Sequence, residues 1–470
     1  MKKADLVIRN GIVISPNSAV QADVAIRDGR IVAIGEDDAF PKGLTELDAA
    51  GKYLIPGAID SHVHFRDPGH TDKENWETGS AAAIVGGVTT VLDMPNTVPH
   101  TGTVEGLLTK REIASSRSYA DFGLYGLLDE SSIDHLEALI AAGVPGFKCF
   151  MCNTTGSLPS PSDGAMLEGF EIIARHGVRC SVHAENASIV EHRSNRLRAA
   201  GRTDALSHLA ARPAVCAIEA VGRAITFAEW TGARLHIAHK SSKDALPLIR
   251  DAKARGVDIT VETCPHYLLM DSRDVERWGG VLRVNPPIRE EGHAAALWQA
   301  LKDGVIDMIS TDHAPHTSGG KNDPNIWNCC CGITGVELQM PLMLTEVNRG
   351  RMTINDYVRW SAVNPAKAWG LFPRKGILQV GSDADIVVVD MGLSDVIDQT
   401  RLHSKQKFTP WHGSTTTGKP IHTILRGQVI VRNGELVMQP GCGREVQPRM
   451  PPPAPRNQDK TLEAVTRAPV

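Results

Sequence analysis

The chain has 470 residues and a formal net charge of −4, with 42% hydrophobic and 22% charged residues. This balance is typical of a globular protein that is long enough for one large domain and a smaller accessory one. The weak net charge leaves no broad basic surface, so we expect neither a nucleic acid nor an anionic membrane as a partner. No run of about 18 apolar residues is present, and the opening MKKADLVIRNGIVIS is typical of a β-strand rather than a signal peptide.

The chain contains nine cysteines without the regular spacing of a disulfide scaffold. In a chain of this length the pattern indicates reduced thiols and a cytoplasmic location. Cys329 to Cys331 are consecutive. Because adjacent side chains rarely point at one ion, we interpret them as packing residues of a loop rather than a metal trap.

Both ends of the chain have the alternating pattern of short strands. Residues 5–35 alternate apolar and polar positions around N-G and D-G pairs, and the same pattern returns at 384–390 and 422–437. Strands from opposite ends can pair with one another. The sequence therefore predicts a small β-sandwich domain built from residues 1–53 and 373–440, with residues 54–372 inserted between its halves.

The inserted part alternates apolar strands with amphipathic helices, which indicates a parallel sheet. Eight strand candidates occur, around AIDSHVH, VTTVLDM, DFGLYGL, GFKCFM, RCSVH, RLHIAH, DITVET and IDMIST. Eight rounds predict a closed (β/α)₈ barrel of the α/β class. An open doubly wound sheet is the alternative, and it is disfavoured because no G-x-G-x-x-G follows the first strand.

The last segment, residues 441–470, is rich in Gly and Pro and includes MPPPAPRNQDK. Such a segment cannot build a core of its own. We expect either a disordered tail or an arm that lies on a neighbouring subunit of a homo-oligomer, a dimer or a tetramer.

Side chains able to bind metal follow several of the predicted strands, and functional groups of a barrel collect at the carboxyl ends of its strands. Alternation along the first strand puts two imidazoles on one face. Imidazoles together with a carboxylate are suited to zinc or a similar ion. Each residue alone is weak evidence, but the whole set is improbable by chance. The set is His62, His64, His183, His239 and Asp312, with Lys148 in the apolar setting GFKCF.

With these motifs in place, the sequence resembles the amidohydrolase superfamily, and within it the cyclic amidohydrolases: dihydroorotase, allantoinase, hydantoinase and dihydropyrimidinase. The likeness runs to about residue 440. It rests on PGAIDSHVHFRDPG, GGVTTVLDMPNT, GFKCFM, SVHAEN, LHIAHKSS, CPHYL, NPPIR and STDHAPH.

The resemblance implies two divalent metal ions, with zinc expected, and a role for each residue of the set. One ion would be held by His62, His64 and Asp312, and the other by His183 and His239. Lys148 would bridge them as a carbamate, N6-carboxylysine. Burial and two nearby cations favour the neutral amine that can react with carbon dioxide. Asp312 would also move the proton from the attacking water to the leaving amide nitrogen.

Four further residues bear on which ring is opened: Arg66, Asn96, Asn285 and His316. The matching Arg, Asn and His residues of dihydroorotases bind the substrate carboxylate, and an Arg fork accepts a carboxylate bidentately. Hydantoinases typically have Tyr where this chain has Asn153. The motifs therefore predict a dihydroorotase-like enzyme that converts dihydroorotate to N-carbamoyl-aspartate, with the likeness closest to dihydroorotase.

Other signs point elsewhere, so alternatives stay open. GFKCF, ARPAVCAIEA and CPHYL look like allantoinase, and many bacterial dihydroorotases of this size lack the bridging lysine. Arg66 could instead form an ion pair with Asp67 or Glu74. Allantoinase and hydantoinase or dihydropyrimidinase activity are the alternatives, and a non-catalytic relative that has lost its ligands is a further one.

Overall fold

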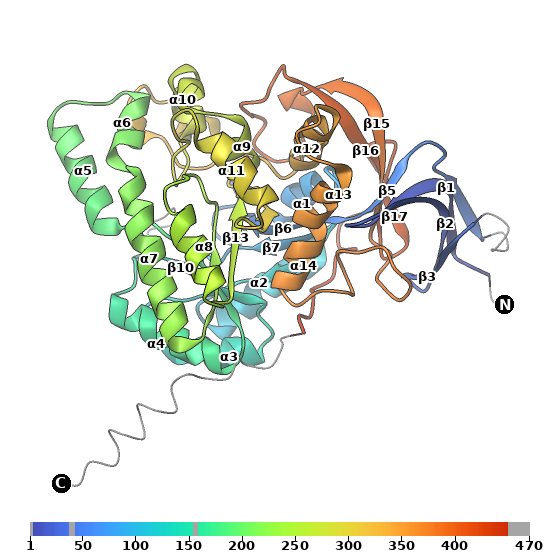
Figure 1. Ribbon diagram of the computed structural model, residues 1–470, viewed down its shortest axis with the longest axis horizontal. Helices are drawn as coiled ribbons and strands as arrows, with labels where there is room; N and C mark the ends of the chain where they lie inside the picture. Colours follow the sequence, from blue (N-terminus) through green and yellow to red (C-terminus); the bar gives the residue numbers. More distant parts are fainter. Residues whose placement is uncertain (1–2, 37–42, 154–157, 450–470) are drawn as a thin grey trace, which may run out of the picture.

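The computed structural model describes residues 3–36, 43–153 and 158–449. These residues form a barrel of strands and helices with a curved sheet beside it (Figure 1). No helix in the described part of the chain is both long and apolar enough to cross a membrane.

Within the described residues, eight parallel strands close into the predicted barrel. They form two stretches, ordered β6-β7-β8 and β9-β10-β11-β12-β13-β14. Only Tyr125 separates β8 from β9, so the two are one barrel strand, and a parallel bridge between Val63 and His313 joins the first strand to the last. The strands are β6 (Ala58–Val63), β7 (Val88–Asp93), β8 (Asp121–Leu124), β9 (Gly126–Leu127), β10 (Gly146–Phe150), β11 (Arg179–His183), β12 (Arg234–Ile237), β13 (Ile259–Thr263) and β14 (Met308–Ile309).

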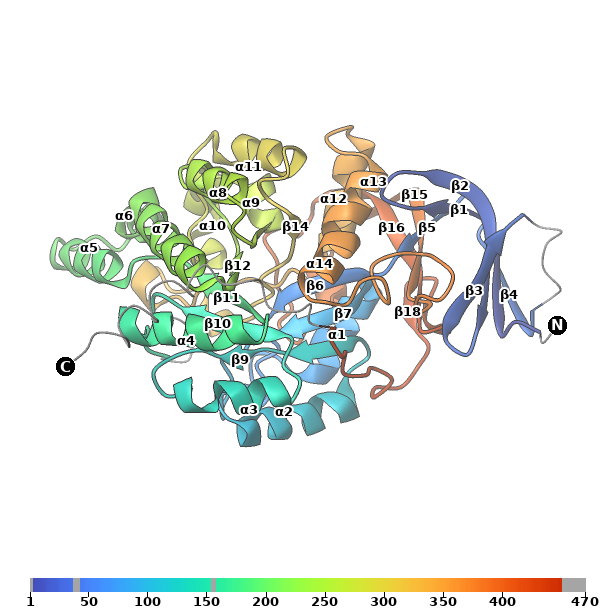
Figure 2. The same cartoon turned by 60° about the horizontal axis from the view of Figure 1, so that its bottom comes forward.

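Helices follow the strands and cover the outside of the barrel (Figure 2). All residues of β6, β7, β10 and β11 are buried, as expected for parallel strands covered on both faces. The helices are α1 (Trp76–Val85), α2 (Val104–Arg117), α3 (Leu136–Ala141), α4 (Asp163–Arg175), α5 (Ala187–Ala199), α6 (Ala205–Ala211), α7 (Ala214–Thr231), α8 (Leu246–Ala254), α9 (Pro265–Leu269), α10 (Ser272–Trp278), α11 (His293–Lys302), α12 (Gln339–Asn348), α13 (Ile354–Val358) and α14 (Asn364–Ala368).

Several of these helices begin at side chains that cap the helix N-terminus. Thr103 and Ser162 accept hydrogen bonds from backbone N–H groups in the first turns of α2 and α4. Asp271 forms a reciprocal capping box with Asp274 at the start of α10. These caps satisfy N–H groups that have no partner within the helix, and so they fix where each helix begins.

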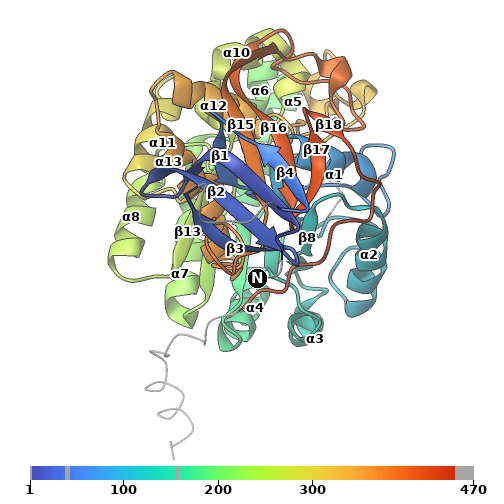
Figure 3. The same cartoon turned by 90° about the vertical axis from the view of Figure 1, so that its right-hand side faces the viewer.

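The two ends of the chain meet in one nine-stranded sheet, which Figure 3 shows in front of the barrel. Its order is β18-β17-β16-β15-β5-β1-β2-β3, with β4 paired to β1, and β5 joins the C-terminal strands to the N-terminal ones. The strands are β1 (Leu6–Ile14), β2 (Ala19–Arg27), β3 (Arg30–Gly35), β4 (Thr45–Asp48), β5 (Tyr53–Pro56), β15 (Ile386–Val396), β16 (Thr415–Leu425), β17 (Gln428–Arg432) and β18 (Glu435–Leu436).

After this sheet the chain returns to the barrel. The backbone of Phe122, in β8, donates to Arg444 O at 3.0 Å and accepts from Val446 N at 2.7 Å, and the Val446 side chain is buried. The segment predicted as a tail thus begins with residues that pack on the barrel. Residues 450–470, which hold its proline run, lie outside the described residues.

A buried cation joins the barrel to the sheet. Lys375 Nζ lies 2.7 Å from Asp121 Oδ2, at the start of β8, and 2.5 Å from Asp385 Oδ2, just before β15. All three side chains are at most 5% exposed. The ammonium therefore compensates carboxylates from both parts of the protein.

We predict that Lys375→Met destabilises the protein by about 3–5 kcal/mol, because it leaves the buried Asp385 without a basic partner among the described residues and leaves Asp121 paired with Arg426 alone. Urea unfolding of the purified variant measures the change. Lys52→Met is the matched control, since Lys52 pairs with Asp390 in a partly exposed position and such pairs contribute about 0–1 kcal/mol. Equal effects of the two substitutions would contradict the assignment of Lys375 as the link.

Candidate metal centre

The predicted ligands come together at the carboxyl ends of the barrel strands. His62 lies in β6 and His64 follows it, His183 ends β11, and His239 and Asp312 come just after β12 and β14. The five residues are buried, with Asp312 at 8% the most exposed. The structure therefore places in one cleft the residues that the sequence placed at separate strand ends.

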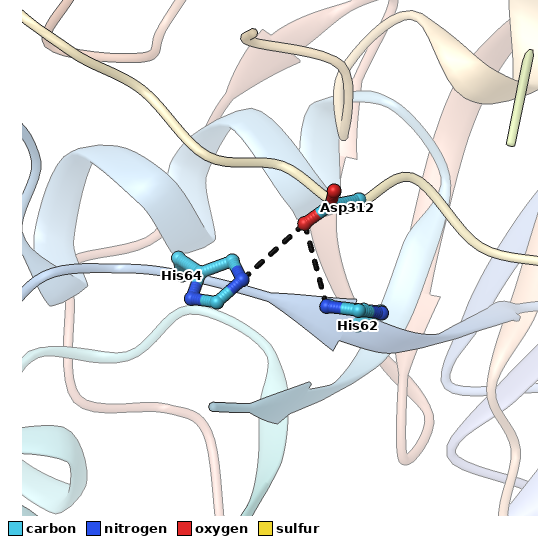
Figure 4. Close-up of side chains that lie close together, drawn as sticks. All are labelled: His62, His64 and Asp312. Carbon is cyan, nitrogen blue, oxygen red and sulfur yellow. Dashed lines mark ion pairs between the residues drawn. The ribbon is translucent and has the colours of Figure 1, made fainter. Parts of the chain in front are cut away.

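Figure 4 shows the first group, which consists of His62, His64 and Asp312. The Nε2 atoms of both imidazoles lie 3.3 Å from Asp312 Oδ1. Two ligands that bind one zinc ion at 2.0–2.1 Å in a tetrahedral arrangement are about 3.4 Å apart. The three side chains therefore fit a divalent cation. This is the one such group of three or more His, Cys, Asp or Glu side chains in the described part of the chain, so Cys329–Cys331 do not form another there.

The second group is the pair His183 and His239. Nδ1 of His183 lies 2.9 Å from Nε2 of His239, and the two rings meet edge to face. The ring of His239 is also 5.1 Å from that of His62, measured between centroids. The second pair of ring nitrogens thus lies directly beside the first group.

Lys148 on β10 lies among these imidazoles. Its side chain is fully buried, and Nζ has no hydrogen-bond partner among the described residues. Burial lowers the pKa of Lys148 to about 8. After the larger effect of burial, the Lys148 charge also lowers the pKa of all four imidazoles, which favours the neutral rings that bind metals.

The backbone at the site adopts conformations that side chains other than glycine seldom take. The φ angles of Arg66, His239 and Asp312 are 62°, 35° and 49°. Such residues cost of order 1–3 kcal/mol each and persist where the surrounding fold holds them. The barrel therefore fixes these side chains in directions that ordinary strand geometry would not give.

Three of the four imidazoles have a hydrogen-bonding partner on the ring nitrogen that faces away from the other ligands. Asn96 Oδ1 lies 2.7 Å from His64 Nδ1, and Glu185 Oε2 lies 2.9 Å from His183 Nε2. Glu262 contacts His62 Nδ1. The sequence analysis missed both glutamates. Glu185 lies in the family motif SVHAEN, and Glu262 lies in the predicted strand DITVET. Asn96, which the motifs assigned to substrate, lines the pocket and also places its amide oxygen against His64.

Arg66 lines the same pocket, together with Asn96 and Asn285. Its side chain is 2% exposed, and no carboxylate oxygen of the described residues lies within 4.0 Å. Asp67 pairs instead with Arg117. The ion pair of Arg66 with Asp67 or Glu74 is therefore absent from the described structure. Burial lowers the pKa of Arg66 to about 10, so the side chain remains a cation at neutral pH.

His316 contacts Arg66 but is not among the residues that line the pocket. Its Nε2 lies 3.3 Å from an Arg66 nitrogen and 2.9 Å from Cys331 O. When this nitrogen carries the proton that it donates to the carbonyl, it cannot accept one from the guanidinium. Arg66 Nε and Asn285 Oδ1 are buried without a partner in the described residues. The pocket thus presents an unused donor and an unused acceptor beside the candidate ligands.

We predict that the metal-free protein loses stability below pH 6.5. Burial, and then the charge of Arg66, hold the pKa of His64 well below 6.5. The unfolded chain takes up a proton there that the buried ring does not, so stability falls as pH falls, by up to ~1.4 kcal/mol per pH unit for one group.

Urea unfolding of chelator-treated wild type and His64→Asn between pH 6.5 and 5.0 measures this contribution. We expect the free energy of unfolding to fall less steeply with decreasing pH in the variant than in wild type. Parallel curves would show that His64 does not titrate as its burial requires.

Known proteins that resemble this chain include a family of hydrolases. Residues 53–430 match the model of the amidohydrolase family, and residues 1–48 match that of the urease alpha-subunit N-terminal domain. An L-hydantoinase of Paenarthrobacter aurescens is 34% identical over 450 residues, covering 95% of this chain and 98% of the relative. An allantoinase of Deinococcus radiodurans is 36% identical over 449 residues, covering 95% and 99%.

The solved structures include close matches to the whole fold. The L-hydantoinase (dihydropyrimidinase) of Arthrobacter aurescens superposes with a TM-score of 0.92 at 34% identity, covering 94% of this chain and all of that one. A D-hydantoinase gives a TM-score of 0.89 at 32% identity, covering 95% of this chain and 99% of that one.

These names do not confirm that the chain is closest to dihydroorotase, as its motifs had predicted. They do confirm the wider resemblance and the barrel. Members of this family use a binuclear metal centre, and the His62, His64 and Asp312 group is consistent with one. The chain belongs to the amidohydrolase family, and within it to the cyclic amidohydrolases, which hydrolyse cyclic amides.

Proposed function

We propose that this protein opens an imidazolidine-2,4-dione ring, the five-membered ring that hydantoin and allantoin share. The observation that carries the proposal is the convergence of four buried imidazoles and Asp312 in the pocket of a chain whose relatives are named L-hydantoinase and allantoinase. Those names support this ring over dihydroorotate, which the sequence motifs had favoured.

The assignment of ligands follows the two groups. His62, His64 and Asp312 would hold one divalent ion, and His183 and His239 the other. Lys148, buried and without a hydrogen-bond partner among the described residues, would bridge them as a carbamate. When bound, the two ions would supply a Lewis-acid pair and lower the pKa of a shared water towards neutrality. Zinc suits a donor set dominated by imidazole.

Asp312 is the proposed proton carrier. It lines the pocket, and its Oδ1 is oriented by two imidazoles. It would accept a proton from the attacking water and deliver it to the ring nitrogen as the carbon–nitrogen bond breaks. The new carboxylate takes its second oxygen from the water, one proton of the water goes to the ring nitrogen and the other is released to solvent, so the atoms and charges balance.

Dihydroorotate is the second candidate, because one specific observation favours it. Arg66 is a buried cation with no carboxylate oxygen of the described residues within 4.0 Å, and its Nε has no hydrogen-bond partner there. A carboxylate on the substrate would satisfy both the charge and the donor. The unpartnered Oδ1 of Asn285 could accept a hydrogen bond from a ring N–H.

Ring-opening rates of zinc-loaded protein on allantoin, hydantoin, dihydrouracil and dihydroorotate test the proposal directly. We expect the highest kcat/KM on allantoin or hydantoin. Hydrolysis of dihydroorotate alone would replace the proposal with the second candidate. Failure to open any of the four rings, with two zinc ions bound, would overturn both.

We further predict that Arg66→Met separates charged from neutral rings. The substitution keeps much of the aliphatic stem and removes the donor of a charge-assisted hydrogen bond, which contributes about 1.5–3 kcal/mol. The kcat/KM for dihydroorotate should therefore fall by about 10²-fold relative to wild type.

Hydantoin and dihydrouracil carry no carboxylate and serve as the internal controls, so their kcat/KM should change little. Equal losses of kcat/KM on charged and neutral rings would show that Arg66 stabilises the structure of the pocket and does not bind a substrate carboxylate.

A further inference from the structure

Glu262 is a fully buried carboxylate on β13, inside the barrel and beneath the candidate ligands. One carboxylate oxygen contacts His62 Nδ1 and accepts from the backbone N–H of His239 at 3.2 Å. The other lies 3.1 Å from Ser61 Oγ and 3.2 Å from His236 Nε2. A single side chain thus touches one candidate ligand from each of the two groups.

The surroundings of Glu262 do not compensate its charge with a strong base. Among the described residues, no lysine or arginine nitrogen lies within 4.0 Å of its carboxylate. A buried carboxylate is unfavourable unless hydrogen bonds or a cation stabilise it, and here four hydrogen-bonding groups surround its two oxygens. The Nε2 atom of His62, on the far side of the imidazole from Glu262, faces Asp312 and the proposed ion.

The partners of the other imidazoles differ in this respect. Glu185 contacts His183 but is also paired with Arg212, so its charge is already neutralised. Asn96, the partner of His64, is uncharged. Of these three partners, Glu262 is the one that brings a negative charge to the centre without a lysine or arginine of its own.

We propose that Glu262 is a positioning residue of the metal centre, holding both His62 and the backbone of His239 in their ligating orientations. By accepting the Nδ1–H of His62 it leaves the Nε2 lone pair free for the ion. By accepting the N–H of His239 it supports a backbone with a φ of 35°. Its charge favours cation binding through the imidazole. The inference rests on the ligand assignment of the proposed function.

Glu262→Gln tests this role, because the amide keeps the size and removes the charge. We expect zinc affinity, measured by chelator competition on metal-free protein, to fall by about 10–100-fold. The melting temperature of the metal-free variant should stay close to that of wild type, because the amide keeps the size of the side chain and its oxygen can still accept a hydrogen bond. A loss of affinity together with retained stability is a combination that a merely structural residue would not give.

Glu346→Gln is the matched control. Glu346 is also a buried carboxylate, but it lies on α12 and is paired with Arg349 and Arg351. This variant should bind zinc as wild type does and should lose stability. Glu262→Asp, which restores the charge on a shorter side chain, should recover part of the zinc affinity.

Nitrogen-15 NMR of the histidine rings gives a readout that needs no variant of Glu262. In the metal-free wild type we expect His62 as the Nδ1–H tautomer, its signal assigned by its loss in His62→Gln. An Nε2–H tautomer, or wild-type zinc affinity in Glu262→Gln, would overturn the positioning role. Wild-type protein that binds zinc but opens no ring would overturn the proposed function and leave this test intact.

Discussion

The hydrogen bond that closes the barrel also assembles its site. The backbone N–H of His64 donates to His313 O at 2.8 Å, and Val63 and His313 form the bridge between the first and last strands. Asp312 immediately precedes that bridge. Closure of the barrel and contact between the first two imidazoles and this carboxylate are therefore one event, and residues about 250 apart in the chain meet because the barrel must close.

The same closure explains why so much charge can be buried here. Lys148 and Arg66 have no carboxylate within ion-pair distance in the described residues, and Glu262 has no lysine or arginine. In most cores such groups would be excluded. At this site each of them faces the same centre, where a cation pair, a carbamate and a bound substrate would offset their charges. The charges that line the pocket are therefore complementary to those of the proposed metal ions and substrate.

The sheet at the chain ends supports the site from outside. β5 lies at the centre of that sheet, and one residue, Gly57, separates it from β6, which carries His62. Gly57 N donates to Asp385 O, and a Cβ at this position would lie 2.1 Å from the Thr89 hydroxyl. The first ligand strand is thus anchored between a sheet built from both termini and the neighbouring barrel strand.

Much of this arrangement was predictable from sequence. The eight apolar strands and the histidines at their ends were recognisable because strand alternation and the geometry of a parallel barrel leave few places for such side chains. The partners of the histidines were not, since Glu262 and Glu185 look like ordinary polar positions until the barrel brings them beneath the rings. The position of Asn96 in the cleft was predictable, but its contact with His64 was not, because sequence shows which cleft a residue enters and not which atom it meets. The ring was harder still, because Arg66 and the relatives' names point to different substrates.

The central claim is a two-metal centre bridged by Lys148, and a crystal structure of zinc-loaded protein with anomalous scattering data tests it most directly. The account predicts two anomalous peaks per chain. One should lie within about 2.0–2.2 Å of His62 Nε2, His64 Nε2 and an Asp312 oxygen, and the other close to His183 Nδ1 and His239 Nε2. Density for a carboxylate on Lys148 Nζ should reach both. A single peak, or an unmodified lysine between two fully occupied ions, would contradict it.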